Sequence, residues 1–274
     1  MSLIELVIVI VILGILSTVL GLIIAGPIRG FFATGRRVAL VENASTALTQ
    51  MARDIRTALP NSIRTTQSGG ITALELLSTL DGARYRDGPG GGVTSSADIL
   101  TFNAASSGFN VLGHFENLTL PLTTTADYLV IYNTGQAGAN AYDISAGPPN
   151  VITPAGTTLS IVSGTYEDHV SISPAFEFKY PSPYDRVYLV GGPVSWFCDP
   201  QAGTLRRESG YAISATEPVS ASAGNLASDQ VSACAFTYTP GTAYRAGLVT
   251  LSLTLSSHNE SVTLLREVQV VNAP

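Results

Sequence analysis

The chain has 274 residues and a formal net charge of −6 at pH 7. Charged residues make up 12% of it, about half of the share in ordinary globular proteins. An acidic chain with so few charges is not typical of a nucleic-acid-binding protein, which needs a basic face. The length allows one long helix and a globular domain of ordinary size.

The chain begins with an apolar segment that contains one carboxylate. Residues 6–25 carry no charge and would rise roughly 30 Å as a helix, enough to cross a bilayer. Glu5 stands at its start, where an unpaired carboxylate in hydrocarbon costs roughly 2.5–3.5 kcal/mol. The available partner is a free α-amino group, in this chain or in an identical neighbour. We therefore interpret Met1 and Glu5 as assembly residues.

The segment lacks the features of a secretory signal peptide. No Lys or Arg precedes it, and the first basic residue is Arg29. Residues 25–29 do not resemble the small-residue site at which such peptides are cleaved. An ordinary signal anchor that tolerates a Glu near its end stays open as the alternative.

The run S-L-I-E-L-V-I-V-I-V-I-L-G-I-L-S at residues 2–17 resembles the N-terminus of type IV pilins and pseudopilins. In that family prepilin peptidase cuts the precursor and methylates the new N-terminus, and Glu is the fifth mature residue. The resemblance implies a processed chain with an N-methylated Met1, where most members have Phe. It also implies a helical filament of copies of this chain, other pilins or both, in which Glu5 pairs with the N-terminal amine of a neighbour.

A second apolar pattern predicts that the helix continues beyond the membrane. Its residues recur every three or four positions: Val38, Val41, Ala44, Leu48, Met51, Ile55 and Leu59. The opposite face carries Arg37, Glu42, Asn43, Gln50, Arg53, Asp54 and Arg56. Pro60 ends the pattern. We expect a stem at residues 1–59, with 1–25 as transmembrane segment or filament core and 38–59 packed on a head.

Four residues weaken the middle of this stem: Gly14, Gly21, Gly26 and Pro27. In assembled pilins the stem is commonly extended near a helix-breaking proline, so the resemblance implies a hinge here. Pro27 lies somewhat later than the usual proline of the family. The alternative is that membrane helices carry more Gly and Pro than soluble ones.

From about residue 61 the sequence pattern predicts β-strands. Short apolar or alternating runs occur at residues 99–102, 128–132, 158–162, 170–173, 176–180, 187–190, 194–198, 231–238, 248–255 and 262–271, separated by turn-rich pieces. The last three are expected to form a central antiparallel sheet under the helix. The predicted fold class is α+β, the type IV pilin fold: a long helical stem on a globular head, residues 60–274, with an antiparallel β-sheet.

Cys198 and Cys234 are expected to form a disulfide. A head behind a membrane anchor lies in the periplasm or outside the cell, where thiols oxidise. The alternative, a metal site, lacks a C-x-x-C motif or a nearby His. A C-terminal disulfide loop is also a common feature of pilins.

Catalytic residues, cofactors and metal ligands are not expected. His114, His169 and His258 are scattered, without a helical His pair. Asp168 precedes His169, but neighbours on a strand point to opposite faces. Glycine-flanked aspartates lack the register of an EF-hand, which leaves calcium binding open. We therefore predict that the chain is not an enzyme.

Residues 51–64 and 248–274 resemble large minor pilins, most closely the O-type minor pilins of mannose-sensitive haemagglutinin pili, and in part the J-type minor pseudopilins. The predicted function is a structural subunit of an extracellular type IV pilus, minor or initiating rather than major. A minor pseudopilin of type II secretion and a filament-presented adhesin are the alternatives. The chain would sit in the inner membrane with its head in the periplasm, and in the extracellular filament after assembly.

Overall fold

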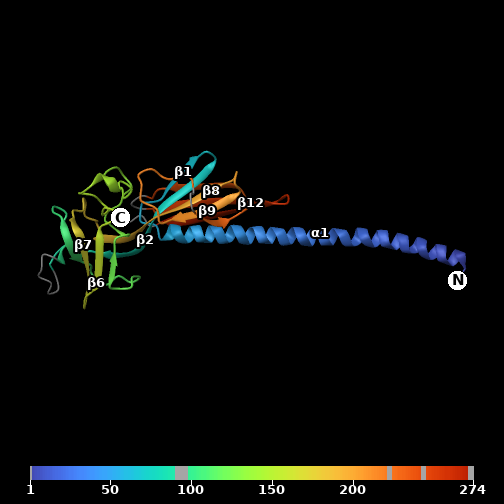
Figure 1. Ribbon diagram of the computed structural model, residues 1–274, viewed down its shortest axis with the longest axis horizontal. Helices are drawn as coiled ribbons and strands as arrows, with labels where there is room; N and C mark the ends of the chain where they lie inside the picture. Colours follow the sequence, from blue (N-terminus) through green and yellow to red (C-terminus); the bar gives the residue numbers. More distant parts are fainter. Residues whose placement is uncertain (1, 90–97, 221–223, 242–244, 271–274) are drawn as a thin grey trace.

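The computed structural model describes residues 2–89, 98–220, 224–241 and 245–270. One long helix, α1 (Leu3–Arg56), extends far beyond a body of strands (Figure 1). Thirteen strands in three sheets and a 3-10 helix, η2 (Ile144–Ala146), make up the regular structure of the described body.

The largest sheet has six strands in the order β1-β2-β8-β9-β10, with β5 paired to β8. Its strands are β1 (Arg64–Ser68), β2 (Ile71–Arg84), β5 (Tyr128–Val130), β8 (Arg186–Asp199), β9 (Thr204–Ser209) and β10 (Asn225–Ser228). All of its pairings are antiparallel. The two longest strands, β2 and β8, form its centre.

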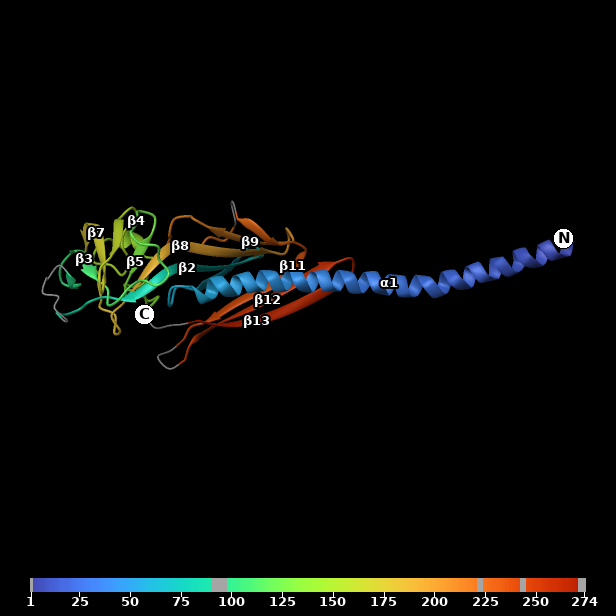
Figure 2. The ribbon, with the colours of Figure 1, turned by 90° about the horizontal axis from the view of Figure 1, so that it is seen from below.

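The other two sheets lie at different ends of the body. An antiparallel meander joins β11 (Val231–Thr239), β12 (Gly247–Ser257) and β13 (Glu260–Val270) alongside α1 (Figure 2). A four-stranded sheet in the order β3-β7-β6-β4 lies at the end farthest from the N-terminus (Figure 1). It contains β3 (Ser106–Asn110), β4 (Leu122–Thr124), β6 (Thr158–Ser163) and β7 (Asp168–Phe176).

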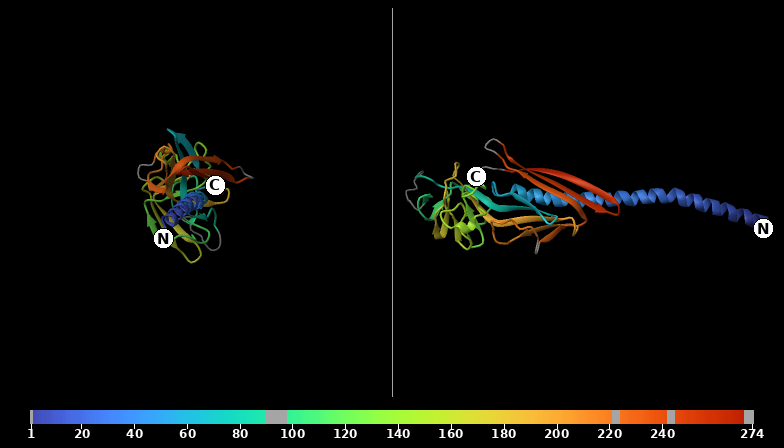
Figure 3. Two further views of the ribbon diagram at one scale, coloured as in Figure 1. Left: turned by 90° about the vertical axis from the view of Figure 1, so that its right-hand side faces the viewer. Right: turned by 90° about the horizontal axis from the view of Figure 1, so that it is seen from above.

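The second half of α1 enters between the six-stranded and three-stranded sheets (Figures 2 and 3). Five residues of the predicted apolar stripe are buried: Ala44, Leu48, Met51, Ile55 and Leu59. All of these but Leu59 share one core with Leu74 and Trp196 of the larger sheet and with Leu251 of the smaller one. This half of the helix is therefore fixed by packing on two sides.

The long strands β2 and β8 connect this core to a second one. Val194 of β8 lies in the core around α1, whereas Val187 and Leu189 of the same strand belong to a distal core with Tyr85 and Phe109. The antiparallel ladder between β2 and β8 extends from Thr72 opposite Cys198 to Arg84 opposite Arg186. One ladder thus joins both halves of the body.

The predicted fold class is wrong. We expected an α+β fold, a helical stem on a head with one central antiparallel sheet; the molecule is mostly β, with thirteen described strands in three sheets. The difference arises mainly in residues 65–185, which contribute most of β1 through β7 and nearly all of the distal core. The predicted three-stranded sheet exists next to α1, but it is not the central one.

The predicted end of the helix is also too late. α1 ends at Arg56, and Thr57 is its C-cap. The amide of Leu59 donates to the carbonyl of Leu77 at 2.8 Å, and the amide of Thr79 donates to the carbonyl of Thr57 at 2.9 Å. Residues after Thr57 therefore leave the helix because β2 offers hydrogen-bond partners to their backbone.

Candidate functional site

The first half of α1 is apolar on all sides. Residues Leu3–Leu20 are long and apolar enough to cross a membrane, which suits a membrane anchor or a signal sequence. Their large side chains are exposed, from 45% at Val9 to 84% at Leu3. Soluble helices normally have a polar face, and large exposed apolar surfaces mark contacts with lipid or protein. This half of α1 is the candidate site.

Glu5 begins the helix together with Ser2. The hydroxyl of Ser2 accepts a hydrogen bond from the amide of Glu5 at 3.4 Å, and the carboxylate of Glu5 accepts one from the amide of Ser2 at 3.1 Å. This reciprocal capping box satisfies two amides that have no partner inside the helix. The S-x-x-E spacing of residues 2–5 is the sequence signature of this capping box.

The capping role leaves room for a second partner of Glu5. An ionised carboxylate has about four acceptor positions, and the amide of Ser2 occupies one of them. Met1, whose amine belongs to the predicted pair, lies outside the described residues. The pairing between Glu5 and an N-terminal amine therefore stays a prediction.

Thr18 satisfies its hydroxyl within the helix. Its Oγ1 donates to the carbonyl of Ile15 at 2.8 Å and lies 3.3 Å from that of Gly14. Such local bonding removes much of the cost of placing a hydroxyl in an apolar medium. Glu5 is then the single charge among residues 1–28, and it stands at the end of the segment.

The helix is continuous through the predicted hinge. The backbone of α1 is helical at Gly14, Gly21, Gly26 and Pro27, and the exposed half of the helix curves gently in Figures 1 and 2. The hinge was predicted for the assembled filament, where neighbouring helices surround this segment. It stays a prediction for that state.

A groove lies where α1 leaves the body. It has a volume of about 480 Å³ and is lined by Ala33, Thr34, Arg37, Val38, Val41, Glu42 and Glu260. Val38 and Val41, the first two residues of the predicted stripe, are therefore 51% and 39% exposed. Exposed apolar side chains of α1 therefore also occur next to the sheets.

Asp54 joins α1 to the six-stranded sheet, although we expected it on the outer face. Its Oδ2 accepts hydrogen bonds from Nε1 of Trp196 at 2.9 Å and from Nε of Arg207 at 2.8 Å. Nη2 of Arg207 adds a bond to Oδ1 at 3.2 Å. Helical spacing did not reveal this role, because the partners lie far away in the sequence.

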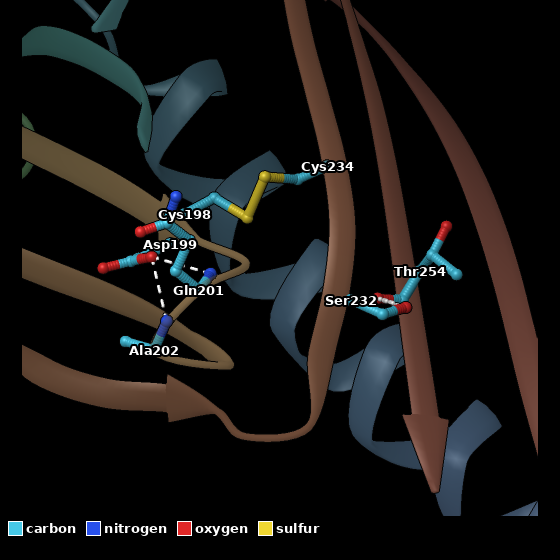
Figure 4. The surroundings of a disulfide bond; sticks show 7 residues. All are labelled: Cys198, Asp199, Gln201, Ala202, Ser232, Cys234 and Thr254. Carbon is cyan, nitrogen blue, oxygen red and sulfur yellow. Dashed lines mark hydrogen bonds between the residues drawn. A yellow bond between two sulfur atoms is a disulfide. The ribbon is translucent and has the colours of Figure 1, made fainter. Parts of the chain in front are cut away.

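The predicted disulfide between Cys198 and Cys234 is confirmed (Figure 4). The Cα atoms are 6.5 Å apart, and no free cysteine is present. Cys198 lies on β8 and Cys234 on β11, so the bond connects two sheets.

A buried polar cluster lies under the connection between β9 and β10. Glu75 is paired with Arg64 and accepts a hydrogen bond from the hydroxyl of Tyr211 at 2.9 Å. Arg64 also donates to the carbonyls of Ser214 and Ala215, each at 2.8 Å. Burial raises the pKa of Glu75 despite the nearby guanidinium. No motif or spacing in the sequence predicts this cluster, because its members come from distant segments.

Glu217 extends the same cluster. Its Oε2 accepts a hydrogen bond from Thr66 at 2.5 Å, whereas its buried Oε1 has no partner among the described residues. Burial raises the pKa of Glu217 to about 7, despite the hydrogen bond from Thr66. The carboxyl is thus partly protonated near neutral pH.

Asp168 and His169 face opposite sides of β7, as expected. Asp168 is buried and contacts Nδ1 of His114 at 2.7 Å and the amide of Phe115 at 2.8 Å. Burial opposes its ionisation, yet the hydrogen bonds from His114 and Phe115 lower the pKa of Asp168. Within the described ranges no three His, Cys, Asp or Glu residues are grouped to hold a metal ion.

Comparison of the chain with protein-family models, curated proteins and solved structures found no match. The function must therefore be argued from the residues and the geometry of this chain.

Proposed function

We propose that the chain is a structural subunit of a type IV pilus, assembled through the exposed apolar half of α1. One observation supports this most directly: the exposed apolar segment Leu3–Leu20 of α1 carries its only carboxylate, Glu5, in the first turn. The capping box uses one acceptor position of this carboxylate, and lipid offers no charged partner for the others. An identical helix alongside offers an amine.

Assembly would bury the apolar half of α1 against the same segment of other copies. Removing such a surface from water is worth about 25 cal/mol per Å² of apolar area, which favours association once the helix leaves the bilayer. The pairing of Glu5 with the amine of a neighbour would then fix the axial register, because a mismatched position would leave both charges unpaired in an apolar core. The groove beside Val38 and Val41 adds further exposed apolar side chains of α1.

The proposal includes processing by prepilin peptidase, with methylation at Met1. Before assembly the chain would be held in the inner membrane by α1 with its head in the periplasm, and afterwards in the extracellular filament. A minor or initiating role is favoured over a major one, because major subunits are usually shorter. A minor pseudopilin of type II secretion uses the same chemistry and stays as the alternative.

The test replaces Glu5 and measures incorporation into filaments. Glu5→Leu should leave the protein folded and in the membrane but exclude it from filaments sheared off the cell surface. Glu116→Leu is the matched control, because Glu116 is an exposed carboxylate on the body, away from α1. It should incorporate normally.

Two results would change the proposal. If Glu5→Leu enters filaments beside the parent protein as efficiently as the control does, Glu5 has no role in assembly. If the parent chain is never found in sheared surface filaments but is required for secretion of folded proteins, the pseudopilin alternative is correct.

A further inference from the structure

A polar hollow lies at the end of the molecule farthest from the N-terminus. Its volume is about 580 Å³. Residues from four separate segments line it: Arg86 after β2, Asp98, Asn110 at the end of β3, and Tyr166, Glu167 and His169 at the start of β7 and in the turn before it. Figure 1 shows β7 at the opposite end from the exposed half of α1.

The polar groups of the hollow are held in place by one another. Arg86 forms a bidentate ion pair with Glu167. Both side chains are largely buried, with 10% of Arg86 and 14% of Glu167 exposed. Nδ2 of Asn110 donates to Glu167 at 3.2 Å, and Oδ1 of Asn110 lies 2.7 Å from Nδ1 of His169. Bonds from Arg86 lower the pKa of Glu167, so it stays an ionised acceptor.

The imidazole of His169 lies close to Gly108, where a side chain would collide with it. A Cβ atom at Gly108 would lie 2.7 Å from the carbonyl oxygen of Val170 and 3.0 Å from Nε2 of His169, so no larger residue fits there. Nδ1 of His169 is engaged by Asn110, which leaves Nε2 for a ligand.

Tyr166 supplies an aromatic surface at the rim. Its side chain is 83% exposed, the largest exposure of any tyrosine or tryptophan among the described residues. An aromatic ring beside fixed donors and acceptors suits a molecule with one apolar face and a rim of hydroxyls. A pyranose ring has that shape: its C–H groups stack on the aromatic face, and its hydroxyls both donate and accept.

The charges of the hollow disfavour other ligands. An anion would need a free cation, but Arg86 is already neutralised by Glu167, and Asp98 would repel it. A calcium ion needs six to eight oxygens, several of them from carboxylates with unbalanced charge, whereas the charge of Glu167 is already balanced by Arg86 and only an acceptor position remains on it. A neutral ligand rich in hydroxyls needs neither a free cation nor a set of free carboxylates.

We propose that this hollow binds a neutral oligosaccharide, stacked on Tyr166 and hydrogen-bonded to Asn110, Glu167 and His169. The site lies on the head alone and goes beyond the proposed function, because it does not depend on filament assembly. Its position far from the apolar helix would present it at the outer end of a membrane-held chain.

The experiment measures binding of purified neutral trisaccharides and tetrasaccharides of glucose, galactose, mannose and N-acetylglucosamine to the full chain. The detergent must be zwitterionic, because detergents with sugar headgroups would compete for the site. We expect at least one of these sugars to bind. Tyr166→Ala should weaken binding about tenfold, the upper range for an aromatic stacking contact, whereas Tyr166→Phe should bind like the parent.

Tyr184→Ala is the matched control, because Tyr184 is 61% exposed and does not line the hollow. It should leave binding unchanged, and calcium ions alone and inorganic phosphate should not bind. The proposal is overturned if none of the sugars binds, if Tyr166→Ala binds as tightly as the parent, or if calcium or phosphate binds more tightly than every sugar. None of these outcomes bears on incorporation into filaments, which the Glu5 test measures separately.

Discussion

The side chain of Asp54 connects α1 to the strands β8 and β9 of the six-stranded sheet. It is 20% exposed and receives hydrogen bonds from Trp196, which is fully buried, and from Arg207. Removing the acceptor would leave the buried indole N–H without a partner and the guanidinium of Arg207 without its counterion, and a buried donor costs more when unsatisfied than a typical hydrogen bond gains. Asp54 is therefore more important for stability than its place on the helix suggests.

We predict that Asp54→Ala lowers the free energy of unfolding by about 1–3 kcal/mol. Asp54→Asn is the control, because it keeps an oxygen for Trp196 while removing the charge that Arg207 needs, and it should cost less. Urea unfolding followed by the fluorescence of Trp196, the single tryptophan of the chain, measures both. Equal stability of Asp54→Ala and the parent would contradict the prediction.

Glu217 makes the folded chain less stable as the pH rises, because its pKa is raised in the folded state. Its pKa is raised by burial from 4.5 to about 7 in the folded chain. Below pH 4.5 the carboxyl is protonated in both states, so the contribution to stability is complete. As the pH rises from 4.5 to about 7, the carboxyl ionises in the unfolded state before it does so in the folded state. The contribution of Glu217 to the free energy of unfolding is therefore lost over this range. Glu75, whose pKa is also raised, acts in the same sense.

We predict that the free energy of unfolding falls between pH 4.5 and 7, and that Glu217→Gln reduces this fall. Because part of Glu217 reaches solvent, screening makes the change in the free energy of unfolding smaller than the pKa shift alone would give. We expect an effect of about 1–2 kcal/mol. Urea unfolding of both proteins at several pH values in this window gives the slope directly. If both proteins show the same slope, the carboxyl of Glu217 does not titrate as described.

Among the elements, the disulfide joins sheets that otherwise meet mainly through side chains. It links β8 to β11 over a sequence separation of 36 residues. β9 and β10 lie within that separation and pair at the edge of the larger sheet. A bond that closes a loop of this length restricts the unfolded chain and stabilises the folded one by roughly 3–4 kcal/mol on the entropic estimate.

We predict that replacing both Cys198 and Cys234 with Ser lowers the free energy of unfolding by a few kcal/mol and leaves membrane insertion unchanged. The parent protein unfolded in a strong reductant is the control and should match the double variant. Mass spectrometry after alkylation without reductant checks the starting state. Two alkylated cysteines in the native protein would show that the bond is not formed.

The elements differ in how far the sequence predicted them. The buried part of the apolar stripe in α1 follows the helical period, because one side of that helix faces a core. β2 gave no strand signal, since both of its faces are buried and its apolar residues do not alternate. β8 was predicted as two runs, because Gly191, Gly192 and Pro193 interrupt the pattern inside one continuous strand.

The functional sites also differ in how far the sequence predicted them. The cysteine pair and the exposed apolar helix were predictable, because each depends on residues of one kind or on one short segment. The polar hollow was not, since Arg86, Asn110 and His169 meet only through the pairing of β3 with β7 and the course of the chain after β2. No spacing in the sequence encodes that meeting.

For the whole molecule, the exposed half of α1 contributes nothing to the packing of the body. Among the side chains that the structure describes in α1, residues 3–20 and 30–56, the first buried one is Leu40, and those before the groove belong to neither core. We predict that deleting residues 1–28 yields a soluble monomer whose free energy of unfolding is within about 0.5 kcal/mol of the full chain. Sedimentation and urea unfolding measure the two properties. A truncated chain that aggregates or is strongly destabilised would show that the apolar half supports the body.

The ladder between β2 and β8 has a mechanical consequence. Both strands run roughly along the long axis of the molecule (Figure 2), and the ladder joins the core around α1 to the distal core. A pull on the distal sheet, with α1 anchored, would act along these strands. Because residues 85–185 connect the distal ends of β2 and β8, both strands would be drawn in the same direction, and their ladders with β1 and β9 would share the force in shear across many bonds at once. The body is thus oriented to bear tension between its two ends.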